Sequence, residues 1–188
     1  MTEYIFPSLS ILVDLCGCPN RCRHCWLGSH PNGDLSAEDF KEIAQVFKDY
    51  KASNPGVIDE LTFYSWWREP DFSNEYRRLR ELEVELSAPY RTERFELLST
   101  WRLAHDETYA EWAADNGPKC CQITFFGMEE TTDWAMGRSG AFADQITATE
   151  RCLNAGIIPR WQIFPLKRTL DGELDALFEL MNELDLHN

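Results

Sequence analysis

Three cysteines near the amino terminus are spaced in a way that suits metal binding. Cys18, Cys22 and Cys25 fall within the eight residues CPNRCRHC, separated by three residues and then by two. Soft thiolate ligands favour iron–sulfur clusters, zinc or copper(I) over hard cations. A cluster normally held by four cysteines would, with only three, keep one iron open to a small molecule. The spacing therefore predicts a metal centre with one free coordination position.

Cys16 offers a competing interpretation of this segment, because it could serve as a fourth thiol. Cys16, Cys18, Cys22 and Cys25 together could close a zinc site of four sulfurs in a binding or scaffold module. His24 could also act as a ligand in such a zinc site. However, only one residue separates Cys16 from Cys18, and the three-then-two spacing is complete without Cys16. We therefore prefer three thiolates and keep the zinc module as an alternative.

Composition narrows the class of protein. The 188 residues are 44% apolar, which predicts a single globular domain over residues 1–188 with a buried core. A net charge of -14 argues against a nucleic-acid partner, since that binding depends on clustered Lys and Arg. Seven cysteines with several in one short loop suit ligation in a reducing cytoplasm better than a disulfide framework. The chain has no apolar run near the roughly 20 residues that span a bilayer, so no membrane segment is expected.

The remainder of the chain alternates between strand and helix patterns. Short apolar runs predict five strands, and apolar residues at helical spacing predict a helix after each of them. The expected strands cover residues 9–15, 58–65, 95–99, 120–126 and 157–166, and the expected helices residues 36–54, 74–86, 106–116, 142–153 and 174–184. Ser36 and Asp39 form a variant capping box at the first helix start. The acidic run 81–85 is expected to be a solvated helix face.

Five strand–helix units in alternation predict an α/β fold with a parallel sheet. The preferred architecture is an open, partial (β/α) barrel of about five units. In such barrels the chemistry lies at the carboxyl ends of the strands, which is where the cysteine segment falls. A flavodoxin-like doubly wound sheet has the same alternation and stays open as an alternative.

The cysteine spacing resembles the cluster loop of the radical S-adenosylmethionine (radical SAM) enzymes, and the resemblance extends over nearly the whole chain. It implies a radical SAM core-like barrel in which Cys18, Cys22 and Cys25 bind a 4Fe-4S cluster. It also implies that SAM chelates the fourth iron and is cleaved reductively. The products expected from the family are methionine and a 5′-deoxyadenosyl radical, which takes a hydrogen atom from an unidentified small-molecule or peptide substrate. An electron donor is then a necessary partner of this oxidoreductase chemistry.

The loop after the second strand carries part of the resemblance. The family usually has two glycines, a glutamate and a proline here, and this chain has Trp67, Arg68, Glu69 and Pro70. The resemblance therefore implies that Glu69 accepts a hydrogen bond from the amino group of SAM, although a strand-end salt bridge to Arg68 or Arg91 is the simpler alternative. Both glycines are replaced by large side chains. A degenerate cluster protein that does not cleave SAM is thus a further alternative.

Two more cofactor-binding residues follow from the resemblance. Thr124, in the fourth expected strand, matches a small hydroxyl residue that contacts the ribose or carboxylate of SAM in the family. A structural role through its β propensity is the alternative. His24 occupies a commonly aromatic position that packs near the adenine. The resemblance assigns no residue that acts on the substrate.

The family's barrels commonly have six strands, whereas this sequence ends at Asn188 after the fifth expected helix. The resemblance is therefore to a short or truncated member. A fifth strand without a neighbour would expose a long apolar edge, which is a template for pairing with another chain. We expect either a homo-oligomer formed through this edge or a partner that covers it.

Overall fold

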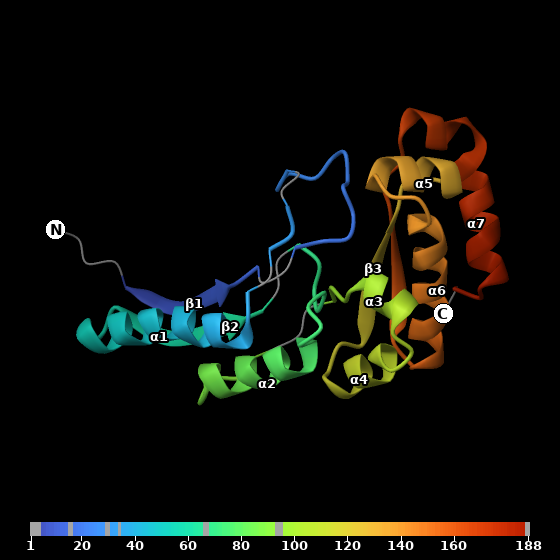
Figure 1. The fold of residues 1–188 in the computed structure, drawn as a ribbon. Coiled ribbons are helices and arrows are strands. Elements are labelled where there is room, and N and C mark those ends of the chain that lie inside the picture. Colours follow the sequence, from blue (N-terminus) through green and yellow to red (C-terminus); the bar gives the residue numbers. More distant parts are fainter. Residues whose placement is uncertain are drawn as a thin grey trace. The chain divides into compact units, whose positions relative to one another are not determined.

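The computed structural model describes residues 5–14, 17–28, 31–33, 35–65, 68–92 and 96–186. The chain divides into two compact units, one of residues 1–18 and 31–93 and the other of residues 19–30 and 94–188. Each unit contains a pair of parallel strands and several helices (Figure 1). The α/β class is therefore confirmed. The single domain over residues 1–188 stays a prediction.

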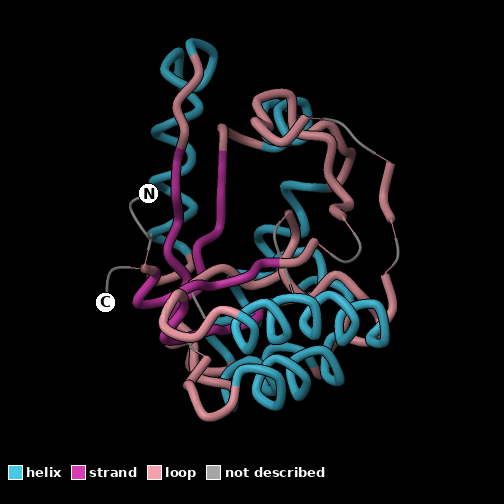
Figure 2. The backbone as a smooth tube through the Cα atoms, turned by 90° about the vertical axis from the view of Figure 1, so that its left-hand side faces the viewer, coloured by secondary structure: helices cyan, strands magenta, loops and turns pink. Residues whose placement is uncertain are grey.

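In the first unit, strand β1 (Phe6–Leu12) pairs in parallel with β2 (Ile58–Tyr64), and both strands are drawn in magenta in Figure 2. Helices α1 (Ala37–Ser53) and α2 (Tyr76–Ser87) pack on one side of this pair. The core of the unit is apolar and contains Val13, Phe40, Ala44, Ile58, Leu61, Phe63, Leu79 and Leu82. Between the strands, the hydroxyl groups of Ser10 and Thr62 lie 3.0 Å apart and form a hydrogen bond. The alternation of Leu61 and Phe63 with Thr62 gives the pair one apolar and one polar face.

The ends of these elements follow the sequence signals closely, with one shift. The Ser36 hydroxyl accepts a hydrogen bond from the Asp39 N–H at 3.2 Å, and the Asp39 carboxylate accepts one from the Ser36 N–H at 2.7 Å. This confirms the capping box. Hydrogen bonds from the Ser36 hydroxyl and N–H hold the pKa of Asp39 below its ordinary value. Strand β1 begins at Phe6 rather than at Leu9, while Leu15 lies outside the described residues.

The acidic run of α2 is not a uniformly solvated face. Glu81 and Glu85 are exposed, but Glu83 is fully buried. Its carboxylate accepts hydrogen bonds from the N–H and hydroxyl of Ser65 at 2.8 and 2.5 Å, and it pairs with Arg80 at 2.8 Å. The expectation for residues 81–85 is therefore wrong at Glu83, because this carboxylate ties α2 to the chain that leaves β2.

In the second unit, β3 (Cys120–Phe125) pairs in parallel with β4 (Ile158–Ile163). Helix α6 (Ala141–Asn154) covers one face of this pair. On that face Phe125 contacts Trp161, with ring centroids 4.1 Å apart, and the Trp161 indole N–H donates to the Thr149 hydroxyl of α6 at 2.9 Å. The opposite face carries polar side chains, where the amides of Gln122 and Gln162 form a hydrogen bond.

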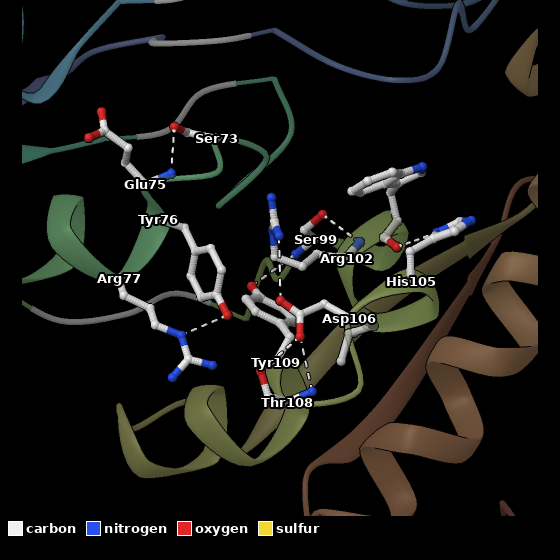
Figure 3. Close-up of polar contacts among 12 residues, drawn as sticks. Ser73, Glu75, Tyr76, Arg77, Ser99, Arg102, His105, Asp106, Thr108 and Tyr109 are labelled. Carbon is white, nitrogen blue, oxygen red and sulfur yellow. Dashed lines mark hydrogen bonds and ion pairs between the residues drawn. The ribbon is translucent and has the colours of Figure 1, made fainter.

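The third expected strand is wrong over residues 96–99, which adopt no strand. Ser99 instead caps helix α3 (Thr100–His105), because its hydroxyl accepts a hydrogen bond from the Arg102 N–H at 3.0 Å (Figure 3). The Ser99 N–H donates to the Tyr109 hydroxyl of α4 (Tyr109–Asp115) at 3.3 Å. Asp106 accepts from the Thr108 N–H at 3.0 Å and marks the break between α3 and α4. Phe95 lies outside the described residues.

The carboxyl-terminal part contains one helix that the sequence patterns do not predict. This helix, α5 (Glu129–Met136), lies between β3 and α6 and ends at Gly137, whose φ of 64° is left-handed. After β4, a short π-helical turn η1 (Thr169–Glu173) leads into α7 (Leu174–Glu183), close to the expected bounds. None of the helices in the described part of the chain is both long and apolar enough to span a bilayer.

Candidate functional site

In the first unit, the structure brings together two of the predicted site residues at the carboxyl end of β1. The Cys18 thiol donates to Oε2 of Glu69, with the sulfur and oxygen 3.9 Å apart. The Cys18 N–H donates to Oδ1 of Asn32 at 3.2 Å. Cys18 and Glu69 are 51 positions apart in the sequence. Their contact forms because β1 and β2 run in parallel, so that the loops following both strands leave the same edge.

The sequence did not predict Asp14, Gly17 and Arg68 as residues of the site. Asp14 accepts a hydrogen bond from the Gly17 N–H at 3.1 Å, and its other oxygen pairs with Nε of Arg68 at 2.5 Å. Gly17 has a φ of 89°, and a Cβ atom there would lie 2.9 Å from Nη2 of Arg68 and would clash with Asn32. Arg68 therefore pairs with Asp14 across Gly17. The available signals were an acid interrupting an apolar run and an arginine replacing a glycine.

In the second unit, the segment with Cys22 and Cys25 is bound to the end of α5 through main-chain hydrogen bonds. The N–H of Arg21 donates to the Met136 carbonyl and that of Arg23 to the Ala135 carbonyl, both at 2.9 Å. The Cys25 N–H donates to the Cys22 carbonyl at 3.1 Å, which makes a tight turn between the two cysteines. Cys22 packs against the small apolar cluster Phe126, Ala135, Met136 and Ala141. The backbone thus sets the geometry of this segment.

Arg138 adds a polar anchor to the same segment. Its Nε donates to Oδ1 of the buried Asn20 at 2.7 Å, and its Nη2 pairs with Asp144 of α6 at 2.6 Å. Arg138 therefore ties the start of the cysteine segment to α6.

His24 and Thr124 occupy different surroundings within the second unit. The His24 side chain is exposed, and its ring lies 4.5 Å from that of Phe126, tilted by 46°. Phe126 also stacks with Phe164, with centroids 5.7 Å apart. Thr124 is partly exposed and is the register partner of Gln162, so it shares the polar face of the β3–β4 pair. The aromatic and hydroxyl groups expected for cofactor binding are therefore accessible, but the structure shows no contact between them.

An open depression of about 930 Å³ borders the cysteine segment at Arg23. The Arg23 guanidinium lies 4.8 Å above the Trp134 ring and donates to the Trp134 carbonyl at 2.9 Å. On another wall, Arg168 pairs with Glu130 at 2.8 Å and with Glu173 at 3.3 Å. The depression is thus lined by charges of both signs.

Glu173 also caps the start of α5. Its carboxylate accepts hydrogen bonds from the Met128 N–H at 2.8 Å and from the Thr131 hydroxyl at 2.7 Å. Burial alone would raise the pKa of Glu173, but hydrogen bonds from Thr131, Met128 and Arg168 outweigh it, and the pKa lies below its ordinary value. Glu173 is therefore ionised at neutral pH.

The three motif cysteines have the donor chemistry that an iron–sulfur cluster requires. Cys18, Cys22 and Cys25 are thiols that form no disulfide, and all three are partly exposed. Cys18 belongs to the first unit and the other two to the second. Within the described residues, no group of three or more Cys, His, Asp or Glu side chains is assembled to hold a metal ion. Cys16, the proposed fourth ligand of a zinc site, lies outside the described residues.

Comparison with known proteins gives one family. A search of curated protein sequences finds no match. The family model described as the radical SAM superfamily matches residues 12–181, which is most of the 188-residue chain and includes the cysteine segment, strands β2, β3 and β4, and most of α7. The chain therefore belongs to the radical SAM superfamily.

Proposed function

We propose that this protein is a radical SAM enzyme in which Cys18, Cys22 and Cys25 bind a 4Fe-4S cluster and Glu69 binds the amino group of SAM. The observation that carries this proposal is the contact between the Cys18 thiol and the Glu69 carboxylate. It places an acceptor for an ammonium group beside the first cluster ligand, although the two preceding glycines of the family are replaced. Three partly exposed thiols that form no disulfide support the cluster assignment.

The chemistry that the cluster and SAM supply together is one-electron reductive cleavage of a carbon–sulfur bond in SAM. The chain's own residues bind and orient these groups. Glu69 accepts a charge-assisted hydrogen bond, His24 stacks against the adenine, and Thr124 offers a hydroxyl group from the polar face of β3. The electron comes from a separate donor. Cysteines outside disulfides suit the reducing cytoplasm that we propose as the location.

We also propose that the strand pairs are parts of an open, partial barrel of the radical SAM type. Both pairs are parallel, and each has an apolar face packed on helices and a face with hydroxyl or amide side chains. Such faces are expected where an interior surface holds a polar cofactor. For the unidentified small-molecule or peptide substrate, we propose the depression at Arg23, since it borders the cysteine segment and carries charges of both signs.

The first experiment is to prepare the protein without oxygen and to measure iron, sulfide, zinc and visible absorption. A brown protein with about four irons and four sulfides per chain is expected, whereas a colourless zinc protein would overturn the proposal. The reduced protein is then incubated with SAM, and methionine and 5′-deoxyadenosine are quantified. Cluster without cleavage would identify a degenerate family member.

The role of Glu69 is tested by calorimetric titration of SAM into the reconstituted protein. Glu69→Gln is expected to weaken binding by about tenfold or more, because a hydrogen bond to a charged group is lost. Glu60→Gln, an exposed position on β2, serves as the matched control. Equal affinity in the parent and Glu69→Gln would show that the amino group is held elsewhere.

A further inference from the structure

Arg68 is held in a defined position beside the first motif cysteine. Its Nε pairs with Asp14 at 2.5 Å, and only 14% of its side chain is exposed. Its Nη2 lies so close to Gly17 that a Cβ atom there would be 2.9 Å away. The ion pair therefore places the outer end of the guanidinium against the residue that precedes Cys18.

The outer end of this guanidinium retains hydrogen-bonding capacity. A guanidinium has five N–H donors, of which the Asp14 pair uses the one on Nε. The structure records no partner for Nη1 or Nη2 among the described residues. These two nitrogens form the fork that binds a carboxylate through two parallel hydrogen bonds. Partial burial strengthens such an interaction because water competes with it less effectively.

The neighbouring Glu69 supplies the complementary charge. Its Oε2 lies 3.9 Å from the Cys18 sulfur, so consecutive side chains of opposite sign flank the Gly17–Cys18 segment. An α-amino acid carries its ammonium and carboxylate groups on one carbon atom. A carboxylate beside Cys18 and a guanidinium beside Gly17 are thus suitable partners for such a ligand, and SAM carries an α-amino acid group at its methionyl end.

We propose that Arg68 binds the carboxylate of the methionyl group of SAM, next to the Glu69 carboxylate that binds its ammonium group. This inference rests on the proposed function. Asp14 acts as a positioning residue, because its contact with Nε fixes the direction of the fork. The replacement of a glycine by Arg68 is then a gain of a SAM-binding side chain.

The experiment compares two ligands on the reconstituted protein, SAM and the analogue of SAM that lacks the carboxylate. Arg68→Gln is expected to weaken SAM binding by about 10- to 100-fold and to change binding of the analogue less than about twofold. Arg68→Lys, which keeps the charge but not the fork, should fall between the parent and Arg68→Gln for SAM. Arg91→Gln, at an exposed position of the same unit, is the matched control. Iron and sulfide content checks that each variant retains its cluster.

The outcomes separate this inference from the function on which it rests. Loss of affinity for SAM alone supports the role of Arg68. Unchanged SAM affinity in Arg68→Gln, or equal losses for both ligands, would overturn the inference while leaving a parent that binds SAM and carries a cluster. A variant that loses its cluster would show that Arg68 supports the loop instead, which also overturns it. A parent that binds no SAM would overturn the proposed function as well.

Discussion

The motif cysteines differ in their immediate surroundings. The Cys18 thiol meets a carboxylate, Cys22 packs against an apolar cluster, and Cys25 closes a turn onto the Cys22 carbonyl. Outside the motif, the hydrogen bond between Cys120 and Glu96 raises the pKa of the Cys120 thiol above its ordinary value. Thiolate is the ligating form of cysteine. The spacing thus favours the motif thiols as cluster ligands, and the raised pKa of Cys120 disfavours that residue.

Replacement of Cys18, Cys22 or Cys25 singly by Ala is expected to abolish cluster assembly, because two thiolates hold a four-iron cluster poorly. Cys16→Ala and Cys120→Ala should leave it largely intact. Iron and sulfide would be measured for each variant after anaerobic reconstitution. A loss at Cys16 equal to that at the motif positions would contradict the three-thiolate assignment and point to a closed four-sulfur site.

The chemistry of single residues was predictable where it depends on spacing, and less so where it depends on contacts. The intervals between Cys18, Cys22 and Cys25 are visible in the sequence, as is Glu69 before a proline. The ion pair between Asp14 and Arg68 joins positions that only the parallel pairing of β1 and β2 brings together. Because the two strands lie far apart in the sequence, their pairing leaves no local sequence pattern at Asp14 or at Arg68.

At the scale of elements, a buried carboxylate organises the end of β2. Glu83 is fully buried, pairs with Arg80, and accepts two hydrogen bonds from Ser65. Ser65 lies shortly before Arg68 and Glu69, so α2 supports the loop that carries both site residues. The sequence suggests a solvated face here because Glu83 stands in an acidic run, and charge pattern alone does not reveal a buried partner.

Glu83→Ala is expected to lower the free energy of unfolding by about 3–5 kcal/mol, because it leaves the Arg80 guanidinium poorly exposed and without this carboxylate. Glu81→Ala, on the exposed side of α2, should change it by less than about 0.5 kcal/mol. Chemical denaturation of the three proteins followed by circular dichroism measures both effects. Similar values for the two variants would mean that the buried carboxylate adds no stability.

The Glu173 cap of α5 predicts a pH dependence. The folded-state pKa of Glu173 lies below its ordinary value of 4.5, so its stabilisation is complete above that pH and is lost as the pH falls through the lowered pKa. Glu173→Gln should therefore unfold at a lower temperature than the parent at neutral pH, and the difference should shrink in acid. Glu179→Gln, exposed on α7, is the control. A difference that stays constant with pH would exclude ionisation as the cause.

Two errors in the predicted secondary structure, the third strand and the missing helix α5, have the same physical cause. Residues 96–99 have apolar character but turn into α3, because the Ser99 hydroxyl caps that helix and Tyr109 holds its N–H. Helix α5 has few apolar residues and is stabilised at its start by Glu173, which lies 45 positions from Met128. Both outcomes depend on a few hydrogen bonds between particular residues, and hydrophobic periodicity does not reveal such bonds. The confirmed helices α1, α6 and α7 have clear apolar stripes.

At the scale of the whole molecule, the edge of β4 is relevant to association with another chain. Among the described residues, β4 pairs with β3 alone; Ile158 at its start and Phe164 just after its end are 58% and 44% exposed. Exposed apolar strand edges favour pairing with another chain. A homo-oligomer, or a partner that covers β4, therefore remains our prediction for this edge.

Light scattering coupled to size-exclusion chromatography is expected to show an average mass that rises with protein concentration. Ile158→Lys should suppress this association, because a charge on an edge strand opposes pairing. Leu153→Lys, also exposed but on α6, should not. A monomeric parent at all concentrations, with no partner recovered by affinity capture, would show that the edge is protected within the chain.

Gly137 lies outside the cysteine motif, but a side chain at this position would disturb the segment with Cys22 and Cys25. A Cβ atom at this position would clash with the Arg21 carbonyl, and the left-handed φ of 64° adds strain for any other residue. The segment with Cys22 and Cys25 is attached to α5 through main-chain groups. The size of the side chain at position 137, which is far from this segment in the sequence, therefore controls how closely the segment can approach α5. Gly137 thus provides an engineering handle by which the attachment of the segment can be loosened while every ligand, charge and hydrogen-bonding side chain is left as it is.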